Sequence, residues 1–175
     1  MPEMNPMMIY RLDRFGRGGH HRPFNDLGYA GVRIMEAHEN YNRQHQDIRT
    51  ENGIEYGDVI SGVNFKYAKK LTAVNAINLA SLGWSPEEPI NVKIGGAVKP
   101  STKLKWEKPK NSKILGYKIY WRKTTSAFWE NSRFVGDTNE FTLEGIVIDN
   151  FLFGVSSVGT NNQESIIVFP KDVIN

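Results

Sequence analysis

The feature that most constrains this chain is a strict alternation of large apolar residues in its second half. The alternating residues are Leu104 and Trp106; Tyr117, Ile119 and Trp121; and Phe151, Phe153 and Val155. Successive side chains of a β-strand point to opposite faces, so a period of two gives each strand one buried face. Two antiparallel sheets packed face to face are therefore the expected fold of this half.

Turn-forming residues divide the second half into short strands. Pro, Gly, Asn or Asp separate about seven runs that are rich in β-branched and aromatic residues. The runs are residues 91–94, 103–106, 117–122, 129–135, 140–143, 151–158 and 165–169. The sequence predicts an all-β, seven-stranded sandwich over residues 90–175.

This region resembles the fibronectin type III family over nearly all of residues 89–170. The resemblance is carried by Pro-x-Asn-Val at 89–92, Leu-x-Trp at 104–106, Gly-Tyr-x-Ile-Tyr-Trp at 116–121 and Phe-x-Phe-x-Val-x-Ser-Val at 151–158. Phe151 stands where the family usually has the tyrosine of its corner motif. One hydrogen bond of about 1 kcal/mol is therefore expected to be missing, which is too little to change the fold.

The first half predicts too few elements for a complete domain. Strands are expected at residues 7–12 and 30–35, a short helix at 23–27, and an irregular polar stretch at 36–61. A long helix at 64–84 has a broad apolar stripe, formed by Leu71, Val74, Ile77, Ala80 and Trp84. Because a core needs two or more complete layers, residues 1–85 read as part of an α/β domain. The Pro-Glu-Glu-Pro at residues 86–89 reads as a linker.

Three segments of the first half resemble the last part of the catalytic domain of di-zinc aminopeptidases. They are residues 13–25 (DRFGRGGHHRPFN), 28–33 (GYAGVR) and 39–45 (ENYNRQH). The family includes bacterial leucyl aminopeptidase, aminopeptidase S and, more distantly, glutamate carboxypeptidase and glutaminyl cyclase. The resemblance implies the end of a zinc exopeptidase fold, two zinc ions per intact site and a peptide substrate. It also implies that His45 is the final zinc ligand.

The chemistry of the loop around His45 agrees with that implication. A neutral imidazole is a good zinc ligand, and a loop can aim it into a cleft. Metal-bound histidines need a partner for the second ring nitrogen, and Glu39 and Asp47 are the nearby candidates. The alternative is a solvated loop histidine among Gln44, Gln46 and Arg43.

Other polar residues near the glycine loop are candidates for contacts with the substrate. His21 matches a histidine that shapes the site in the family, although His20 replaces the acid that usually precedes it. Arg14 and Arg17 could hold a substrate carboxylate or carbonyl oxygen; the alternative is two solvated charges on a flexible loop. A separate metal site of His20, His21 and His45 is disfavoured, because adjacent residues on an extended chain point oppositely.

Composition excludes several other classes. The chain has no cysteine, so its chemistry must rest on His, carboxylates, Arg and the backbone. Ten basic and nine acidic residues lie at or before Pro86, with twelve and ten after it, so neither half has the positive charge that nucleic acid requires. No run is apolar enough to cross a membrane. The resemblance to bacterial secreted peptidases implies a secreted or periplasmic protein.

These observations lead to two hypotheses. The family's remaining groups, a His-x-Asp segment, a Glu-Glu pair and a later Asp, are not found before Asp13, and a zinc site needs at least three protein ligands. We therefore expect the C-terminal part of an exopeptidase, inactive by itself. The alternative is a non-catalytic module whose sandwich binds protein or polysaccharide. For that module Trp121 and Trp129 could form a stacking surface, although tryptophan in a small sandwich usually belongs to the core.

Overall fold

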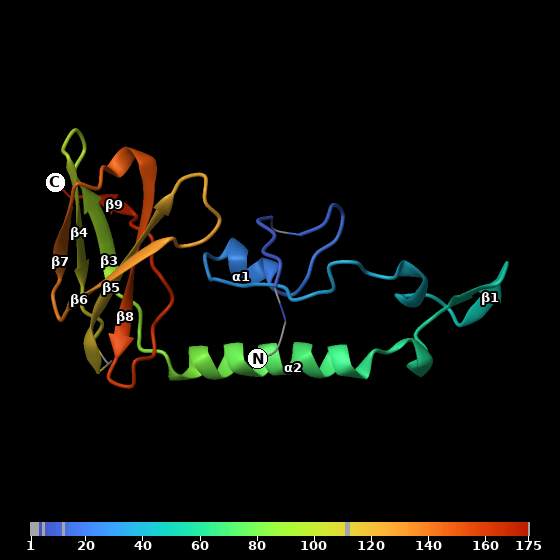
Figure 1. Ribbon diagram of the computed structural model, residues 1–175. Helices are drawn as coiled ribbons and strands as arrows, with labels where there is room; N and C mark the ends of the chain where they lie inside the picture. Colours follow the sequence, from blue (N-terminus) through green and yellow to red (C-terminus); the bar gives the residue numbers. More distant parts are fainter. Residues whose placement is uncertain (1–3, 5, 12, 111–112, 175) are drawn as a thin grey trace. The chain divides into compact units, whose positions relative to one another are not determined.

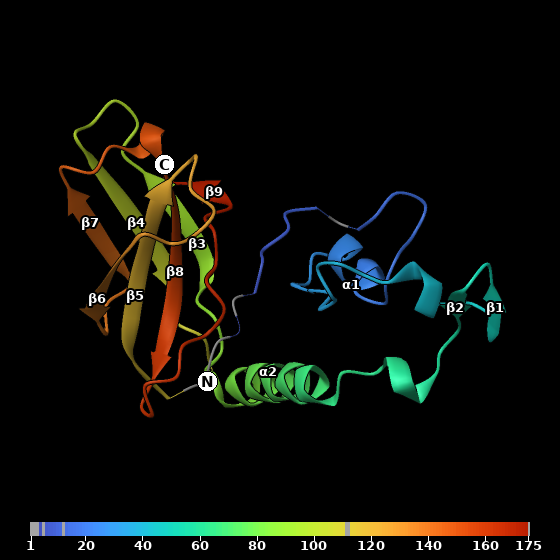
Figure 2. The same cartoon turned by 45° about the vertical axis from the view of Figure 1, so that its right-hand side comes forward.

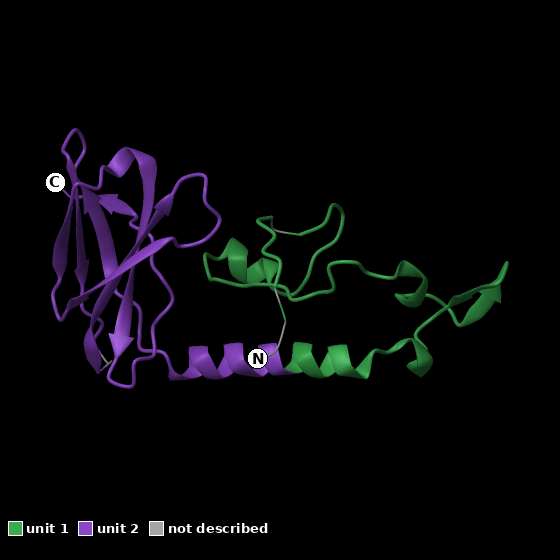
Figure 3. Cartoon of the chain, viewed as in Figure 1, with its two compact units in different colours: residues 1–72 green, residues 73–175 purple. Residues whose placement is uncertain are grey.

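The computed structural model describes residue 4 and residues 6–11, 13–110 and 113–174. The chain forms two compact units, residues 1–72 and 73–175 (Figure 3), and each is described by itself. The division falls within helix α2 (Phe65–Trp84). The expected linker at 86–89 follows the end of this helix, and the domain boundaries derived from the sequence stay a prediction.

Two sheets make up most of the second unit (Figures 1 and 2). The first contains β3 (Ile90–Gly95), β4 (Ser101–Glu107), β7 (Glu140–Glu144) and β9 (Asp172–Val173), in the order β7-β4-β3-β9. The second contains β5 (Ile114–Lys123), β6 (Asn131–Gly136) and β8 (Phe151–Gly159), in the order β6-β5-β8. All these strand pairs are antiparallel except β3 with β9. This is the β-sandwich that the alternation predicts.

The alternating apolar residues fill the space between the sheets. Their buried members are Val92, Leu104, Trp106, Tyr117, Ile119, Leu143, Phe153 and Val155. The rings of Trp106 and Tyr117 lie 5.2 Å apart between centroids, within the range of favourable aromatic pairs. Phe151, at the position expected to lack a corner hydroxyl, is partly buried and packs against this core.

The end of the sandwich differs from the prediction. Residues 165–169 do not form a continuous strand. One isolated bridge, Val155 with Val168, attaches this segment to β8, and a second, Val158 with Glu164, attaches the residue just before it. Strand β9, which was not predicted, pairs in parallel with β3. Its two residues are too few to show a periodic pattern in the sequence.

The carboxylate of Glu164 fastens the segment after β8 to the outer face of the β6-β5-β8 sheet. Lys118 Nζ donates to Glu164 at 2.9 Å, Ser156 Oγ lies 3.3 Å from it, and the hydroxyl of Tyr120 donates to the same carboxylate. Burial raises the pKa of Glu164, but the hydrogen bonds from Tyr120 and Lys118 outweigh burial and hold it below its ordinary value of 4.5.

We expect this contact to make the sandwich sensitive to acid. A carboxyl whose pKa is lowered by folding adds stability above its unfolded-state pKa, and that stability is lost as the pH falls through the folded-state pKa. In Glu164→Gln, the urea midpoint should therefore fall less between pH 7 and pH 3 than in the wild type. Glu144→Gln, at an exposed position of β7, is the control. Equal acid sensitivity in wild type and Glu164→Gln would contradict the assignment.

The first unit contains short elements and the beginning of a long helix. These are α1 (Arg22–Asp26), the 3-10 turns Tyr41–Arg43 and Ile60–Gly62, strands β1 (Arg49–Glu51) and β2 (Ile54–Tyr56), and α2 as far as Thr72. Both predicted helices are confirmed. Asn64 caps α2, since its side chain accepts a hydrogen bond from the Tyr67 amide at 3.1 Å.

Two strand predictions for this unit are wrong. Residues 7–11 and 30–35 belong to no strand in the structure, and residue 12 lies outside the described residues. A strand exists through hydrogen bonds to a neighbour, and no described strand pairs with either segment. Conversely, the β1–β2 hairpin lies within the stretch predicted to be irregular. Its signal was Asn52-Gly53, a typical hairpin turn with φ of 49° and 77°.

Candidate functional site

Charged side chains from four segments of the first unit meet in one place. We call this group the ionic cluster; its members are Asp13, Arg14, His21, Arg33, Glu39 and Gln44. His21 precedes α1, and Gln44 follows the 3-10 turn Tyr41–Arg43. All the segments quoted for the peptidase resemblance therefore contribute to this cluster.

Asp13 is the most buried charge of the cluster, with a side chain 3% exposed. Its Oδ1 accepts hydrogen bonds from the Arg14 amide at 2.7 Å and from Arg33 Nη1 at 3.3 Å. The hydrogen bond from the Arg14 backbone N–H holds the pKa of Asp13 below its usual range, and both guanidinium groups act in the same direction. Asp13 is therefore ionised at neutral pH. A buried carboxylate needs such partners to remain charged.

Glu39 is the second acid of the cluster. Arg14 Nη1 lies 2.7 Å from Glu39 Oε2, and Arg33 Nη2 lies 3.8 Å from Oε1. Gln44 Nε2 donates to the same Oε1 at 3.4 Å. The two arginines thus bridge two carboxylates, and their charges are balanced.

His21 has a carboxylate nearby, although the acid that usually precedes this histidine in the peptidase family is missing here. His20 stands where the peptidase family usually has an acid, but Asp13 Oδ2 comes within 3.9 Å of His21 Nε2 from another segment. That distance suits an ion pair and is too long for a hydrogen bond. A carboxylate therefore lies beside His21 even though the neighbouring residue is a histidine.

The other predicted site residues lie outside the cluster. Arg17 follows Arg14 in a tight turn, with its amide donating to the Arg14 carbonyl at 3.3 Å. Asp47 is exposed, and its backbone carbonyl accepts from Arg49 at 3.3 Å. His45 is exposed and has a left-handed backbone, with φ of 54°. Glu39, Arg14 and His21 come together, and their roles in binding or catalysis stay predictions.

The described residues do not make a zinc site by themselves. Across residue 4, 6–11, 13–110 and 113–174, no three His, Asp or Glu side chains gather in a metal-binding arrangement. His20, His21 and His45 thus form no separate site. Since zinc sites use at least three protein ligands, His45 could serve a metal only together with ligands from elsewhere.

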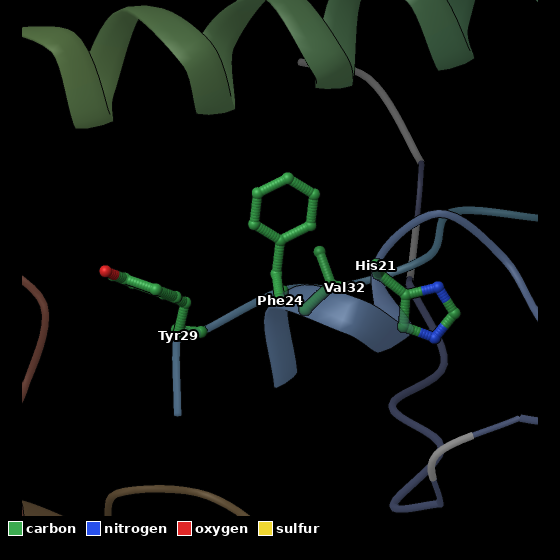
Figure 4. Close-up of a pocket in the computed structure, with 6 residues that line it drawn as sticks. His21, Phe24, Tyr29 and Val32 are labelled. Atoms are coloured by element: carbon green, nitrogen blue, oxygen red, sulfur yellow. The ribbon is translucent and has the colours of Figure 1, made fainter. Parts of the chain in front are cut away.

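A hollow of about 500 Å³ lies beside α1 (Figure 4). It is lined by His21, Phe24, Tyr29, Ala30, Gly31 and Val32. Phe24, Tyr29 and Val32 are all more than half exposed, and Figure 4 shows the imidazole of His21 directed away from Phe24. The hollow is therefore an open apolar surface beside the ionic cluster.

Sequence reasoning missed Asp13 and Arg33 as members of the site. Both lie within the motifs quoted for the resemblance, yet neither has a motif role. A buried carboxylate is rare unless it is paired, and the pairing of Asp13 with Arg33 spans 20 positions. Such a contact leaves no local pattern in the sequence.

The two tryptophans considered for ligand stacking are packed in the sandwich. Trp121 is partly buried against the core. Trp129 lies 5.8 Å from Tyr120 and 5.3 Å from Phe169 between ring centroids, with Arg122 over its ring at 5.5 Å. Trp121 thus packs against the core as expected, whereas Trp129 packs against Tyr120 and Phe169 outside the core cluster.

Comparison with known proteins relates the chain to fungal proteases. No protein-family model matches the sequence. A probable zinc metalloprotease of Leptosphaeria maculans is 45% identical over 168 residues, which is 95% of this chain and 39% of that protein. Proteins of the same name from Phaeosphaeria nodorum and Pyrenophora tritici-repentis are 40% and 39% identical, over 96% of this chain and 34% and 39% of their own lengths.

Solved structures overlap with about half of the chain. The fibronectin type III domain of human collagen alpha-1(XX) has a TM-score of 0.41 and 16% identity, covering 53% of this chain and 90% of that domain. A myokine structure has a TM-score of 0.39 and 20% identity, covering 50% of this chain and all of its own.

Two further findings bear on the sequence predictions. None of the described helices, α2 included, combines the length and the apolar character that a membrane span needs. The relatives named above are fungal, whereas the resemblance had suggested bacterial proteins. The chain is related in sequence to proteins named probable zinc metalloproteases, and it spans between 34% and 39% of their lengths.

Proposed function

We propose that this chain is the C-terminal part of a zinc exopeptidase of the di-zinc aminopeptidase type, followed by a fibronectin type III-like module. The observation that carries the proposal is the relationship to probable zinc metalloproteases, which extends over 95% of the chain and so includes both units. In the intact protein, a water molecule activated by two zinc ions would hydrolyse the N-terminal peptide bond. His45 would supply one ligand.

The surface of the first unit supports the proposal that other protein layers cover it. Among its described residues, Gly57 alone is buried. Phe24, Leu27, Tyr29 and Val32, around α1, are between 59% and 78% exposed. Contiguous exposed apolar residues mark an interaction surface. The rest of the peptidase domain, which the relatives' greater length can accommodate, is the proposed cover.

The ionic cluster supports the same proposal from its chemistry. It pairs Arg14 with Glu39 and places His21 beside Asp13, and Gln44 joins Glu39 to the loop of His45. His21 is named from the resemblance, and Arg14 and Glu39 are named from their chemistry and their place in the sequence. In the intact protein Arg14 and Glu39 would orient that loop, and His21 would shape the site beside it. Secreted or periplasmic localisation stays a prediction.

The proposal is tested in the longer protein, which carries this chain together with the region that the relatives have beyond the match. Replacing His45 with Ala should lower both zinc content and hydrolysis of aminoacyl-nitroanilides. Losing a partner of a ligand already costs about 10–100-fold, so losing a ligand should reduce hydrolysis by more than about 100-fold.

The matched control is His38→Ala, because His38 is also exposed and lies seven positions earlier without a motif role. Zinc content and turnover of His38→Ala should equal those of the wild type. If His45→Ala keeps two zinc ions and full turnover, His45 is no ligand. If the wild-type protein hydrolyses no aminoacyl bond, the aminopeptidase assignment is wrong and the non-catalytic interaction module becomes the better hypothesis.

The 175-residue chain provides a second test of the same proposal. Because its described residues form no group of three ligands, isothermal titration should detect no tight zinc binding, and the chain should not turn over aminoacyl-nitroanilides. Tight binding of two zinc ions with turnover would show that the catalytic apparatus lies within this chain, against the proposal.

A further inference from the structure

We propose that Asp13 and Arg33 are positioning residues that fix the loop carrying His45. This loop, residues 39–45, is called the presenting loop. The functional meaning of the inference rests on the proposed role of His45, whereas the mechanical part concerns the chain's own contacts.

Asp13 holds two arginines of the ionic cluster. The Asp13 side chain is 3% exposed, and its Oδ1 receives both the Arg14 amide at 2.7 Å and Arg33 Nη1 at 3.3 Å. A buried carboxylate that accepts two donors holds both of them in place, because leaving the charge without partners would be strongly unfavourable. Arg14 Nε also lies 3.5 Å from Asp13 Oδ1. Asp13 thereby holds the backbone of Arg14 and orients both guanidinium groups.

The two arginines in turn contact Glu39, the first residue of the presenting loop. Arg14 Nη1 grips Glu39 Oε2 at 2.7 Å, while Arg33 Nη2 approaches Oε1 at 3.8 Å. The Glu39 side chain is 11% exposed. Its Oε1 then accepts from Gln44 Nε2 at 3.4 Å, so the start and the end of the loop are joined through one carboxylate. Because Arg14 is paired with Asp13 and Glu39, it is not available to bind a substrate carboxylate or carbonyl oxygen.

A second set of contacts holds the middle of the presenting loop. The Gly57 amide donates to the Asn42 carbonyl at 2.8 Å, and Arg43 Nη2 lies 2.6 Å from Glu55 Oε2 of β2. An added Cβ at position 57 would lie 2.8 Å from Ile48 Cα. Glycine is therefore needed where this segment passes Ile48. The presenting loop is therefore held by the ionic cluster and by the segment of the β1–β2 hairpin.

His45 follows these anchors directly and has a φ of 54°. A left-handed backbone is unfavourable for a histidine and persists where the surroundings impose it. The contact of Gln44 with Glu39 lies next to this residue. The anchors thus account for a side chain that is exposed and yet held on a fixed backbone, as a metal ligand or other reactive group requires.

The test uses Asp13→Asn in the full chain without added metal. This variant keeps the shape of the side chain and removes the charge that holds Arg14 and Arg33. Amide hydrogen exchange in residues 40–45 should lose its protection, and trypsin should cleave faster after Arg43. The ring signal of His45 in NMR spectra should shift or broaden, while that of His38 stays unchanged. A purely structural role would not single out one histidine ring.

Two further variants keep the test decisive. Glu140→Gln is the matched control, since Glu140 is paired with Lys103 at 2.9 Å in an exposed ion pair of the sandwich; it should leave the presenting loop unchanged. Arg33→Lys keeps the charge but loses the guanidinium fork that reaches both Asp13 and Glu39, and it should loosen residues 40–45 while α1 and the hairpin stay protected.

The outcomes separate clearly. Wild-type exchange and an unchanged His45 signal in Asp13→Asn would overturn the inference. If Asp13→Asn unfolds the whole first unit, Arg33→Lys decides: selective loosening of the loop supports the inference, and no effect or uniform loosening overturns it. The measurements need no zinc, so they are independent of whether His45→Ala abolishes zinc binding in the longer protein.

Discussion

Replacing Trp106 with Ala should cost the sandwich about 3–5 kcal/mol of unfolding free energy, the usual loss for a buried aromatic residue reduced to a methyl group. Trp106 is 1% exposed, lies next to the last residue of β4 and pairs with Tyr117 across the core. The cavity left behind would be lined by residues of both sheets, which are too well paired to collapse into it. Urea unfolding followed by the NMR signals of β4 and β5 measures the effect on the sandwich alone.

The control for this prediction is Trp84→Ala. Trp84 ends α2 and is 69% exposed, so the same chemical change should alter the free energy of unfolding by less than about 0.5 kcal/mol. Equal losses in the two variants would show that Trp106 is not the centre of a packed core.

Replacing Gly116 with Ala should strongly destabilise the sandwich, although the change adds a single methyl group. An added Cβ would lie 2.6 Å from the Gly136 carbonyl carbon and 2.7 Å from Phe134 Cζ, both on the neighbouring strand β6. Gly116 also lies between the two register shifts by which β5 adapts to β8 and β6. The backbone of β6 must move away, so the cost should reach at least the 1–3 kcal/mol typical of overpacking.

Gly83→Ala is the matched control. Gly83 lies within α2, and an added Cβ would meet nothing within 4 Å. Alanine should therefore stabilise the helix there by about 0.5–1 kcal/mol. Hydrogen exchange of the β6 amides separates the two variants: Gly116→Ala should expose them, and Gly83→Ala should not. Unchanged β6 protection in Gly116→Ala would contradict the close approach.

The sandwich could be predicted because its information is local. Leu104, Trp106, Tyr117 and Ile119 alternate along the strands, and alternation directly states which face is buried. The bridges of residues 165–169 and the short β9 were missed because both depend on where β8 and β3 already lie. Their residues contribute too few periodic positions to be recognised alone.

The candidate site could be predicted in part. The resemblance named His21, the chemistry of the segment named Arg14 and Glu39, and the structure places all three in one cluster. Asp13, which contacts Arg14 and His21, has no assigned role in the quoted motif, and its partner Arg33 is distant in sequence. Long-range ionic contacts of this kind are set by the fold and not by neighbouring residues. Arg17 and Asp47 lie near the cluster in sequence, yet no described contact joins their side chains to it.

The sparse interior of the first unit has a consequence for how the chain denatures. A single free energy of unfolding applies when a protein melts in one cooperative step. Here one unit is organised around the apolar core of a sandwich. The other is organised around paired charges and has one buried residue, a glycine, among its described residues. Such units have no reason to melt together. A midpoint measured for the whole chain therefore describes neither of them, and each needs its own probe.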